Sequence, residues 1–302
     1  MKKIKVRSDE DAAVRDLISE IPFWIRREAD LPFPVLQNLA QLWLFVFPRQ
    51  DWKKMRQVLL LVTIWIIITD RFFESKLMSE PQLRIFCQNI DCFLKNEKEN
   101  SNNQKISNKS MDFSERLLKN ICQMLSEQKV DQRFWAEWKR AVKNFLTGMA
   151  NERNFSFVHP PSLRQYLKNG RQSIGSSAVL YAVALLIFRA RWLKPKEFAI
   201  IKKIIKDSSL VLRLINDLGS HERERAHKTL NSLVVLMKQG ETLESAQEKI
   251  SSLIERNIAI FKQRKKSAPL KCHPFFTALS RLLRFTSNLY ETKDYHGEAP
   301  RP

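Results

Sequence analysis

Glycine is scarce in this sequence, and its scarcity restricts the folds that the chain can adopt. Only six of the 302 residues are glycine. Hairpin turns and phosphate-binding loops depend on glycine because they need a positive φ or a close approach of the backbone. The six glycines form neither the Gly-x-Gly-x-x-Gly pattern of a dinucleotide fold nor a phosphate loop. The sequence therefore argues against both folds and against a many-stranded barrel, and it favours a helical protein.

The chain is strongly basic, since 52 lysines and arginines outnumber 32 aspartates and glutamates and give a formal charge of +20. Such an excess is typical of proteins that bind nucleic acid, and a basic helical nucleic-acid-binding protein is one hypothesis for this chain. The cations are nevertheless spread along the sequence and form no recognised binding motif. We therefore expect no nucleic-acid partner.

The N-terminal residues, the apolar segments and the cysteines indicate the cellular compartment of the protein. Residues 1–5 are basic, but no apolar stretch follows them as a secretory signal would require. The longest apolar run, 58–69, is too short to cross a bilayer. The four cysteines are expected to be reduced thiols. These features predict a cytoplasmic protein with no integral membrane segment.

Apolar residues recur with helical spacing along most of the chain. The expected helices cover residues 35–47, 52–74, 80–94, 113–128, 132–152, 160–191 with an interruption near 175–177, 196–239, 244–264 and 274–290. Residues 1–30 are charged and expected to be irregular, and residues 95–112, rich in Asn, Lys and Ser, are expected to form a flexible loop. The basic stretch 262–271 is also expected to be a loop, broken by Pro269. The patterns predict an all-α, single-domain bundle of eight to ten helices.

A row of oxygen-bearing side chains is the most specific motif. Asn216, Ser220 and Glu224 stand at i, i+4 and i+8, which aligns them on one face of a helix. An amide oxygen, a hydroxyl and a carboxylate form an all-oxygen ligand set of the kind that Mg²⁺ accepts together with water and substrate phosphates. The alternative is an ordinary solvated helix face.

Two further sequence patterns place charged residues next to apolar helical segments. Asp70 and Glu74 lie one turn apart where the apolar run ends, and such a pair is costly to bury unless a cation neutralises it. Arg171 precedes Gly175, a glycine within an apolar helical pattern that indicates a break beside a cavity. The alternatives are a polar helix end that reaches solvent and a simple kink with a surface arginine.

Together, the three patterns resemble those of bacterial-type class I terpene synthases. Asn216, Ser220 and Glu224 match that family's Asn-Asp-x-x-Ser-x-x-x-Glu metal motif at each defining position. The resemblance implies the family's helical fold for a domain over residues 31–302, preceded by a segment, 1–30, that caps the site. It also implies a prenyl diphosphate substrate and three Mg²⁺ ions, held by Asp70, Glu74, Asn216, Ser220 and Glu224.

The resemblance further implies roles for residues outside the metal set. Arg171 corresponds to the diphosphate-sensing arginine, Arg223 to a basic contact with the diphosphate, and Gly175 to the position whose carbonyl faces the substrate. Tyr295 lies near the place of a terminal Arg-Tyr pair, and Lys293 would supply the positive charge there. With Asp70, the residues Arg171, Gly175 and Tyr295 are expected to act in ionisation.

The sequence departs from the family pattern at two places. Thr69 and Asp70 stand where the acid-rich motif normally opens with two acids. Either Asp70 or Glu74 must then replace the lost ligand, or the first metal site is weak. Asp294 stands where the terminal arginine belongs, and the adjacent Lys293 cannot form the bidentate fork of an arginine.

Aromatic residues near the acidic pair are candidates for the wall of the substrate cavity. The π-faces of Trp65, Phe72 and Phe73 would stabilise a carbocation, whereas the alternative is plain core packing. Farnesyl diphosphate is the expected substrate, and geranylgeranyl diphosphate is close behind because small residues follow Gly175.

Three functions follow from the sequence. The first is an active terpene synthase that forms a cyclic hydrocarbon or alcohol. The second, motivated by Thr69 and Asp294, is a homologue that has lost catalysis and only binds ligands or partners. The third is the nucleic-acid-binding protein that the charge suggests. A homodimer is included among the expected assemblies.

Overall fold

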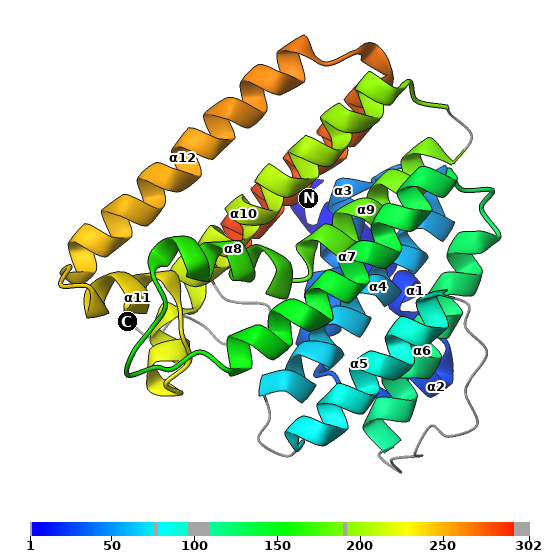
Figure 1. Cartoon of the computed structure of the whole chain (residues 1–302). Helices are drawn as coiled ribbons and strands as arrows, with labels where there is room; N and C mark the ends of the chain where they lie inside the picture. Colours follow the sequence, from blue (N-terminus) through cyan, green and yellow to red (C-terminus); the bar gives the residue numbers. More distant parts are fainter. Residues whose placement is uncertain (1, 75–77, 96–108, 190–191, 293–302) are drawn as a thin grey trace.

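The computed structural model describes residues 2–74, 78–95, 109–189 and 192–292. Within these residues it has thirteen α-helices, two short 3-10 helices and no strand (Figure 1). The elements are α1 (Lys2–Ser19), α2 (Phe23–Glu28), α3 (Phe33–Val46), η1 (Gln50–Trp52), α4 (Lys53–Glu74), α5 (Glu80–Lys95), α6 (Lys109–Ser126), α7 (Gln132–Arg153), α8 (Leu163–Ser173), α9 (Ser176–Phe188), α10 (Pro195–Ala226), α11 (Ser232–Lys238), α12 (Leu243–Ser267), η2 (Leu270–Cys272) and α13 (His273–Thr292). The expected all-α bundle is confirmed, with more helices than predicted.

Residues 1–30, expected to be irregular, contain two of the additional helices, α1 and α2. α1 buries Val14, Leu17 and Ile18, and Ile21 follows at the next position of the same face. These residues recur at i, i+3, i+4 and i+7, so the charged sequence contains a narrow apolar face. Because α1 packs against α3, the segment is part of the bundle.

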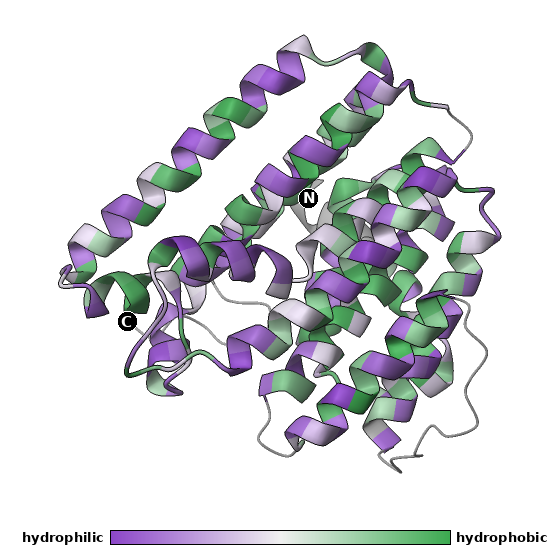
Figure 2. Ribbon diagram, in the orientation of Figure 1, coloured by the Kyte–Doolittle hydropathy of each residue, from purple (hydrophilic) through white to green (hydrophobic). Residues whose placement is uncertain are grey.

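The centre of the bundle is formed by α4 and α9, which are apolar on nearly every side. α9 packs against α4, α6, α7, α10 and α13. In Figure 2 the region of α4 and α9 is mostly green, whereas α12 carries many purple residues along the rim. A helix that is apolar all round must be surrounded by other helices, which explains the central place of the run at 58–68.

The break expected near Gly175 is confirmed. Gly175 joins α8 to α9 with a φ of 70°, a left-handed conformation that strains residues with a Cβ atom. α8 begins with a capping box, in which the Oγ of Ser162 accepts from the backbone N–H of Gln165 and the Gln165 side chain accepts from the N–H of Ser162. The two helices meet at an angle of 45°.

The single helical region expected over 196–239 is two helices, α10 and α11. They are separated at residues 227–231, where Lys228 has a φ of 55°. The side-chain oxygen of Asn231 accepts from the backbone N–H of Leu233 and caps α11. Neither glycine nor proline signals this break, since a buried asparagine produces it.

Two expected loops differ from the observed connections. α12 continues to residue 267, so much of the basic stretch 262–271 is helical. Positive charges suit the C-terminal end of a helix dipole, and the helix ends just before Pro269. Of the loop expected at 95–112, residue 95 ends α5 and 109–112 begin α6, while 96–108 lie outside the described residues.

Within the described ranges, no single helix is long and apolar enough to cross a membrane. The bent pair α8–α9 passes the test of length and composition, but α9 is packed against five neighbouring helices.

Candidate active site

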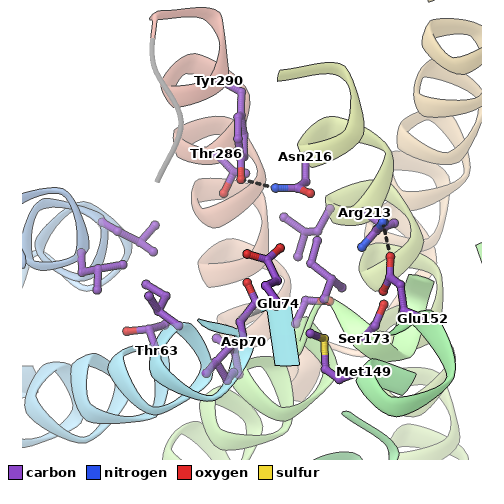
Figure 3. Close-up of a pocket in the computed structure, with 18 of the residues that line it drawn as sticks. Thr63, Asp70, Glu74, Met149, Glu152, Ser173, Arg213, Asn216, Thr286 and Tyr290 are labelled. Atoms are coloured by element: carbon purple, nitrogen blue, oxygen red, sulfur yellow. Dashed lines mark hydrogen bonds and ion pairs between the residues drawn. The ribbon is translucent and has the colours of Figure 1, made fainter. Parts of the chain in front are cut away.

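A cavity of about 200 Å³ lies between α3, α4, the α8–α9 junction, α10 and α13. Much of its wall is apolar, formed by Leu39, Leu42, Ile66, Ile67, Met149, Ile174, Val179, Leu180, Leu212 and Leu282. Carboxylates, an amide and two arginines from α4, α7 and α10 also line it, namely Asp70, Glu74, Glu152, Arg213, Asn216, Arg223 and Glu224. Figure 3 labels the first five of these. An apolar space bordered by oxygen donors and cations is therefore available to an amphiphilic anion.

α4 supplies one acidic side of the cavity. Thr63, Ile66, Ile67, Asp70 and Glu74 line it, so the acids follow the apolar positions toward the C-terminal end of the helix. Burial, and next the charge of Glu74, raises the pKa of Asp70 well above its ordinary value. Burial also raises the pKa of Glu74. The pair lacks sufficient positive charge, which a bound cation would supply.

Thr69 does not belong to this cavity. Its side chain is fully buried against α6, with Oγ1 at 3.2 Å from the Oγ of Ser114. Consecutive residues of a helix differ in direction by about 100°, so Asp70 faces the cavity while position 69 faces α6. The threonine, expected to weaken a metal site, therefore takes no ligand away from this cavity.

α10 supplies the opposite side. Asn216 lines the cavity, and its Nδ2 donates to the hydroxyl of Tyr290 on α13 at 2.5 Å. The Oδ1 of Asn216 has no hydrogen bond within the described part of the chain. Ser220, expected as a ligand, is 1% exposed, and its Oγ donates to the backbone oxygen of Asn216 at 2.7 Å. The structure thus brings Asn216 to the cavity and leaves Ser220 turned toward its own helix.

Glu224 is held by a residue that the sequence did not reveal as important. The Nδ2 of Asn231 donates to Glu224 Oε2 at 2.8 Å and to the backbone oxygen of Asp217 at 2.6 Å. Burial, and next the charge of Asp217, raises the pKa of Glu224 to about 8. Asn231 therefore both caps α11 and fixes the carboxylate.

A buried network beside the cavity was also missed. Arg213 pairs with Glu152 at 2.7 Å and with Asp217 at 2.9 Å, while the hydroxyl of Tyr166 donates to Asp217 at 3.1 Å. Arg213 also donates to the Tyr166 hydroxyl. The only signal of this network in the sequence is the position of Arg213, one helical turn before Asn216. The network fixes an arginine at the cavity wall before any ligand binds (Figure 3).

The donor set fits Mg²⁺ only in part as it stands. Among the described residues, no group of three His, Cys, Asp or Glu side chains is gathered into a metal site. Asp70, Glu74 and Glu224 nevertheless share one cavity, their pKa values are raised, and Asn216 has a free amide oxygen. Carboxylate and amide oxygens completed by water and phosphate are the ligands that Mg²⁺ takes. The chemistry of these donors therefore suits Mg²⁺ only when water and phosphate oxygens supply the remaining ligands.

Arg171, expected to engage the diphosphate, does not line this cavity but a second one. Ser173 does face the first cavity, and two helical positions differ in direction by about 200°, which turns Arg171 away. No described residue of the segment 1–30 lines the first cavity, and its capping role stays a prediction.

The three aromatic candidates pack in the core instead of facing the cavity. Trp65 lies against Phe145, with ring centroids 5.7 Å apart, and Phe72 lies edge-on to Phe86 at 6.3 Å. Phe73 is buried in the same core. No aromatic residue of α4 is among those that line the cavity, so the plain packing interpretation describes these three side chains.

The remaining predicted site residues are Gly175, Arg223, Lys293 and Tyr295, and the structure describes only the first two. Gly175 is not among the lining residues, although its neighbours Ile174 and Ser176 are. Arg223 lines the cavity as expected. Lys293 and Tyr295 lie outside the described residues.

Comparisons with known proteins point in one direction. The model of the family "terpene synthase family 2, C-terminal metal binding" matches residues 61–259. No curated protein matches the sequence. Solved structures with the same fold include isoprene synthase from grey poplar (Populus x canescens) in complex with three Mg²⁺ ions and dimethylallyl-S-thiolodiphosphate. The two sequences are 17% identical, and the structures superpose with a TM-score of 0.73. The match covers 96% of this chain and 55% of that chain.

Two others are linalool/nerolidol synthase from Streptomyces clavuligerus and abietadiene synthase from Abies grandis. The first has 13% identity and a TM-score of 0.70, covering 93% of this chain and 95% of that one. The second has 18% identity and a TM-score of 0.74, covering 96% of this chain and 38% of that one. The chain thus spans about half the length of the poplar structure and less of the Abies one. At these identities the likeness concerns the fold.

Proposed function

The chain belongs to terpene synthase family 2 and has the all-α class I fold, and we propose that it is an active enzyme that ionises a linear prenyl diphosphate with Mg²⁺ and converts the allyl cation to a terpene hydrocarbon or alcohol. One observation carries the proposal: oxygen donors of α4 and α10 line the same, largely apolar cavity (Figure 3). The charge of Glu224 contributes to the raised pKa of Asp70, which means that the two acidic sides are electrostatically in reach of each other.

We assign the metal ligands to both sides of the cavity. Asp70 and Glu74 would hold Mg²⁺ on α4, and Asn216 and Glu224 on α10. Ser220 could join them only after its hydroxyl leaves the carbonyl of Asn216. When bound, Mg²⁺ would neutralise these carboxylates and stabilise the charge that develops on the departing diphosphate. Three ions remain the expectation from the family.

Two arginines would act on the diphosphate. Arg223 lines the cavity, and its charge opposes the rise in the pKa of Glu74, which indicates that it lies close to the acidic side. Arg213 is already oriented by Glu152 and Asp217. Preorganised positive charge of this kind stabilises a leaving anion without reorganisation during the reaction.

The apolar part of the cavity would hold the hydrocarbon chain and keep water from the carbocation. Its volume of about 200 Å³ lies below the roughly 300–1,000 Å³ typical of pockets for drug-sized ligands. Of the two expected substrates, this size counts against the longer one, geranylgeranyl diphosphate, and leaves farnesyl diphosphate as the one we propose. Aliphatic side chains such as Ile66 and Leu282 offer no nucleophile that would capture the cation.

The test is incubation of the purified protein and Mg²⁺ with geranyl, farnesyl and geranylgeranyl diphosphates, followed by gas chromatography and mass spectrometry. We expect a terpene product, predominantly from farnesyl diphosphate. Glu224→Gln should lower kcat by about a hundredfold or more, as removal of one electrostatic contact to a transition state does. The absence of product from all three substrates would contradict the proposal and favour the ligand-binding homologue.

Glu222→Gln is the matched control, because Glu222 lies two positions away on α10 and is exposed. It should keep the kcat of the unmodified protein. Product formation that persists undiminished in Asn216→Ala and Glu224→Gln would overturn the assignment of the ligands while leaving the family activity intact.

A further inference from the structure

A second cavity of about 650 Å³ lies between α7, α8, α9 and α10. The α8–α9 junction separates it from the first cavity. Ser173 and Ser176 line the first cavity, whereas Arg171 and Ser177 line the second. The two spaces are therefore distinct, and none of the proposed metal ligands lines the second.

Positive charge dominates the second cavity. Its charged lining residues are one carboxylate and five cations: Glu137, Arg140, Arg171, Lys202, Lys203 and Lys206. Glu137 pairs with Arg140 and, at 2.6 Å, with Lys202. Burial lowers the pKa of Arg171, and burial together with the charge of Arg140 lowers the pKa of Lys202. The shift of Arg171 reflects burial alone, whereas that of Lys202 adds repulsion from a neighbouring cation.

Several hydrogen-bond donors of this cavity have no partner within the described ranges. Within the described ranges, the half-buried Arg171 and the exposed Lys203 and Lys206 form neither a hydrogen bond nor an ion pair. Tyr181 is 8% exposed, and its hydroxyl, which solvent reaches, makes no hydrogen bond in the described part of the chain. A guanidinium, two ammonium groups and a phenol around one space form a donor set for an anion with several oxygens.

The remaining wall is apolar. Phe198, Ala199 and Ile205 of α10 and Ala141 of α7 line the space beside the cations. A purely ionic site has no need of such surface, whereas a ligand with a hydrocarbon part can cover it. The concave shape also suits a compact head group better than a nucleic-acid backbone, which requires an extended track of cations.

We propose that this second cavity binds the phosphate or diphosphate group of an amphiphilic organophosphate. Arg171, Lys203 and Lys206 would contact the anionic oxygens, with the hydroxyl of Tyr181 as a further donor. The same chemistry occurs in soluble prenyl phosphates and in anionic lipid head groups. The proposal does not depend on the enzymatic activity, because its residues lie outside the first cavity.

The test measures binding to the full chain in EDTA, which removes the divalent ions that the first cavity would need to hold a diphosphate. Inorganic diphosphate is titrated by calorimetry, and co-sedimentation is measured with vesicles of phosphatidylcholine alone or mixed equally with phosphatidylglycerol. Lys203→Gln/Lys206→Gln is compared with Lys262→Gln/Lys266→Gln, which removes the same charge from exposed positions of α12. The pairs differ only in whether they line the cavity.

We expect the Lys203/Lys206 variant to bind at least about tenfold more weakly, since each lost charge-assisted hydrogen bond is worth about a tenfold change or more. The α12 variant should lose less than about twofold. Weakened binding of diphosphate indicates a soluble ligand, and weakening confined to the phosphatidylglycerol vesicles indicates a lipid head group. Equal losses in both variants, or no binding of either probe, would overturn the proposal. An unchanged melting temperature in both variants excludes misfolding as the cause.

Discussion

At the residue scale, the burial of Glu224 and the nearby charge of Asp217 make the stability of the fold depend on pH. The pKa of Glu224 rises from 4.5 to about 8 because the carboxyl is buried and lies near Asp217. Between these pH values the folded chain holds a proton that the unfolded chain has released. The free energy of unfolding of the metal-free protein therefore falls as pH rises through this window. We expect a lower melting temperature in EDTA at pH 8.5 than at pH 6, as measured by scanning calorimetry.

The raised pKa values of Asp70 and Glu74 act in the same direction. Mg²⁺ should raise the melting temperature more at pH 8.5 than at pH 6, because it binds the ionised carboxylates. Glu224→Gln should flatten the pH profile, whereas Glu222→Gln should leave it unchanged. A melting temperature that increases steadily from pH 6 to pH 8.5 without metal would refute this account of the acidic side.

Gly219 is a second residue whose substitution has a defined outcome. A Cβ atom there would overlap the ring of Tyr290, so the two helices α10 and α13 meet closely only because position 219 has no side chain. Gly219→Ala should destabilise the fold by about 1–3 kcal/mol, the usual cost of overpacking. Denaturant unfolding with tryptophan fluorescence would measure it.

The control is the same substitution in a Tyr290→Ala background. With the ring removed, alanine should be neutral or stabilising by up to about 1 kcal/mol, because it favours a helix more than glycine does. If Gly219→Ala costs the same in both backgrounds, the contact with Tyr290 is not its cause.

The placement of single residues could be predicted from the sequence where helical spacing determines the direction of a side chain. Asp70, Glu74, Asn216 and Glu224 reach one cavity because each pair shares a helix face. The sequence could not reveal Asn231, because its contacts with Glu224 and Asp217 depend on how the chain turns back after α10.

At the scale of the elements, the α8–α9 junction depends on Gly175. A Cβ atom there would lie 2.7 Å from Cγ2 of Ile66, in addition to the strain of a φ of 70°. Gly175→Ala should cost about 1–2 kcal/mol from the left-handed backbone alone, and more from the contact. Because Ile66 lines the first cavity, we also expect lower kcat and an altered product ratio.

Gly240→Ala is a matched control for the strain. Gly240 has a φ of 97°, but nothing lies within 4 Å of a Cβ atom placed there. This variant should lose stability while keeping kcat and the product ratio. Equal losses of stability in the two variants would show that the contact with Ile66 contributes nothing.

The helices themselves were largely predictable from apolar periodicity and from proline and glycine signals. The exceptions have physical causes. α1 was missed because its apolar face is narrow within a charged segment, and the break between α10 and α11 was missed because a buried side chain produces it. The direction of Arg171 was missed because it depends on the phase of α8 relative to Gly175.

At the scale of the whole molecule, the charge of +20 should attract an anionic substrate over long distances. Raising NaCl from about 50 to about 500 mM shortens the screening length to a few ångströms. For the proposed prenyl diphosphate substrate, we expect kcat/KM to fall severalfold while kcat stays nearly constant, measured at fixed free Mg²⁺. A parallel fall in both constants would mean that salt acts on the site itself rather than on encounter.

The fold class followed from scarce glycine and pervasive helical spacing, because both are properties of the entire sequence. Cavities depend on the packing of distant segments, so neither their volumes nor their walls could be inferred. The aromatic wall expected from Trp65, Phe72 and Phe73 illustrates this, since these side chains fill the space between helices.

The α8–α9 junction has a practical consequence for anyone who wishes to redesign the product spectrum. Residues 171–177 form a thin partition: Arg171, Gln172 and Ser177 line the second compartment, whereas Ser173, Ile174 and Ser176 line the first. A library of variants at these positions would alter both compartments, so a change in the product could not be assigned to either one. Leu39 on α3 and Leu282 on α13 border the first compartment alone, so they are the independent positions from which to resize it.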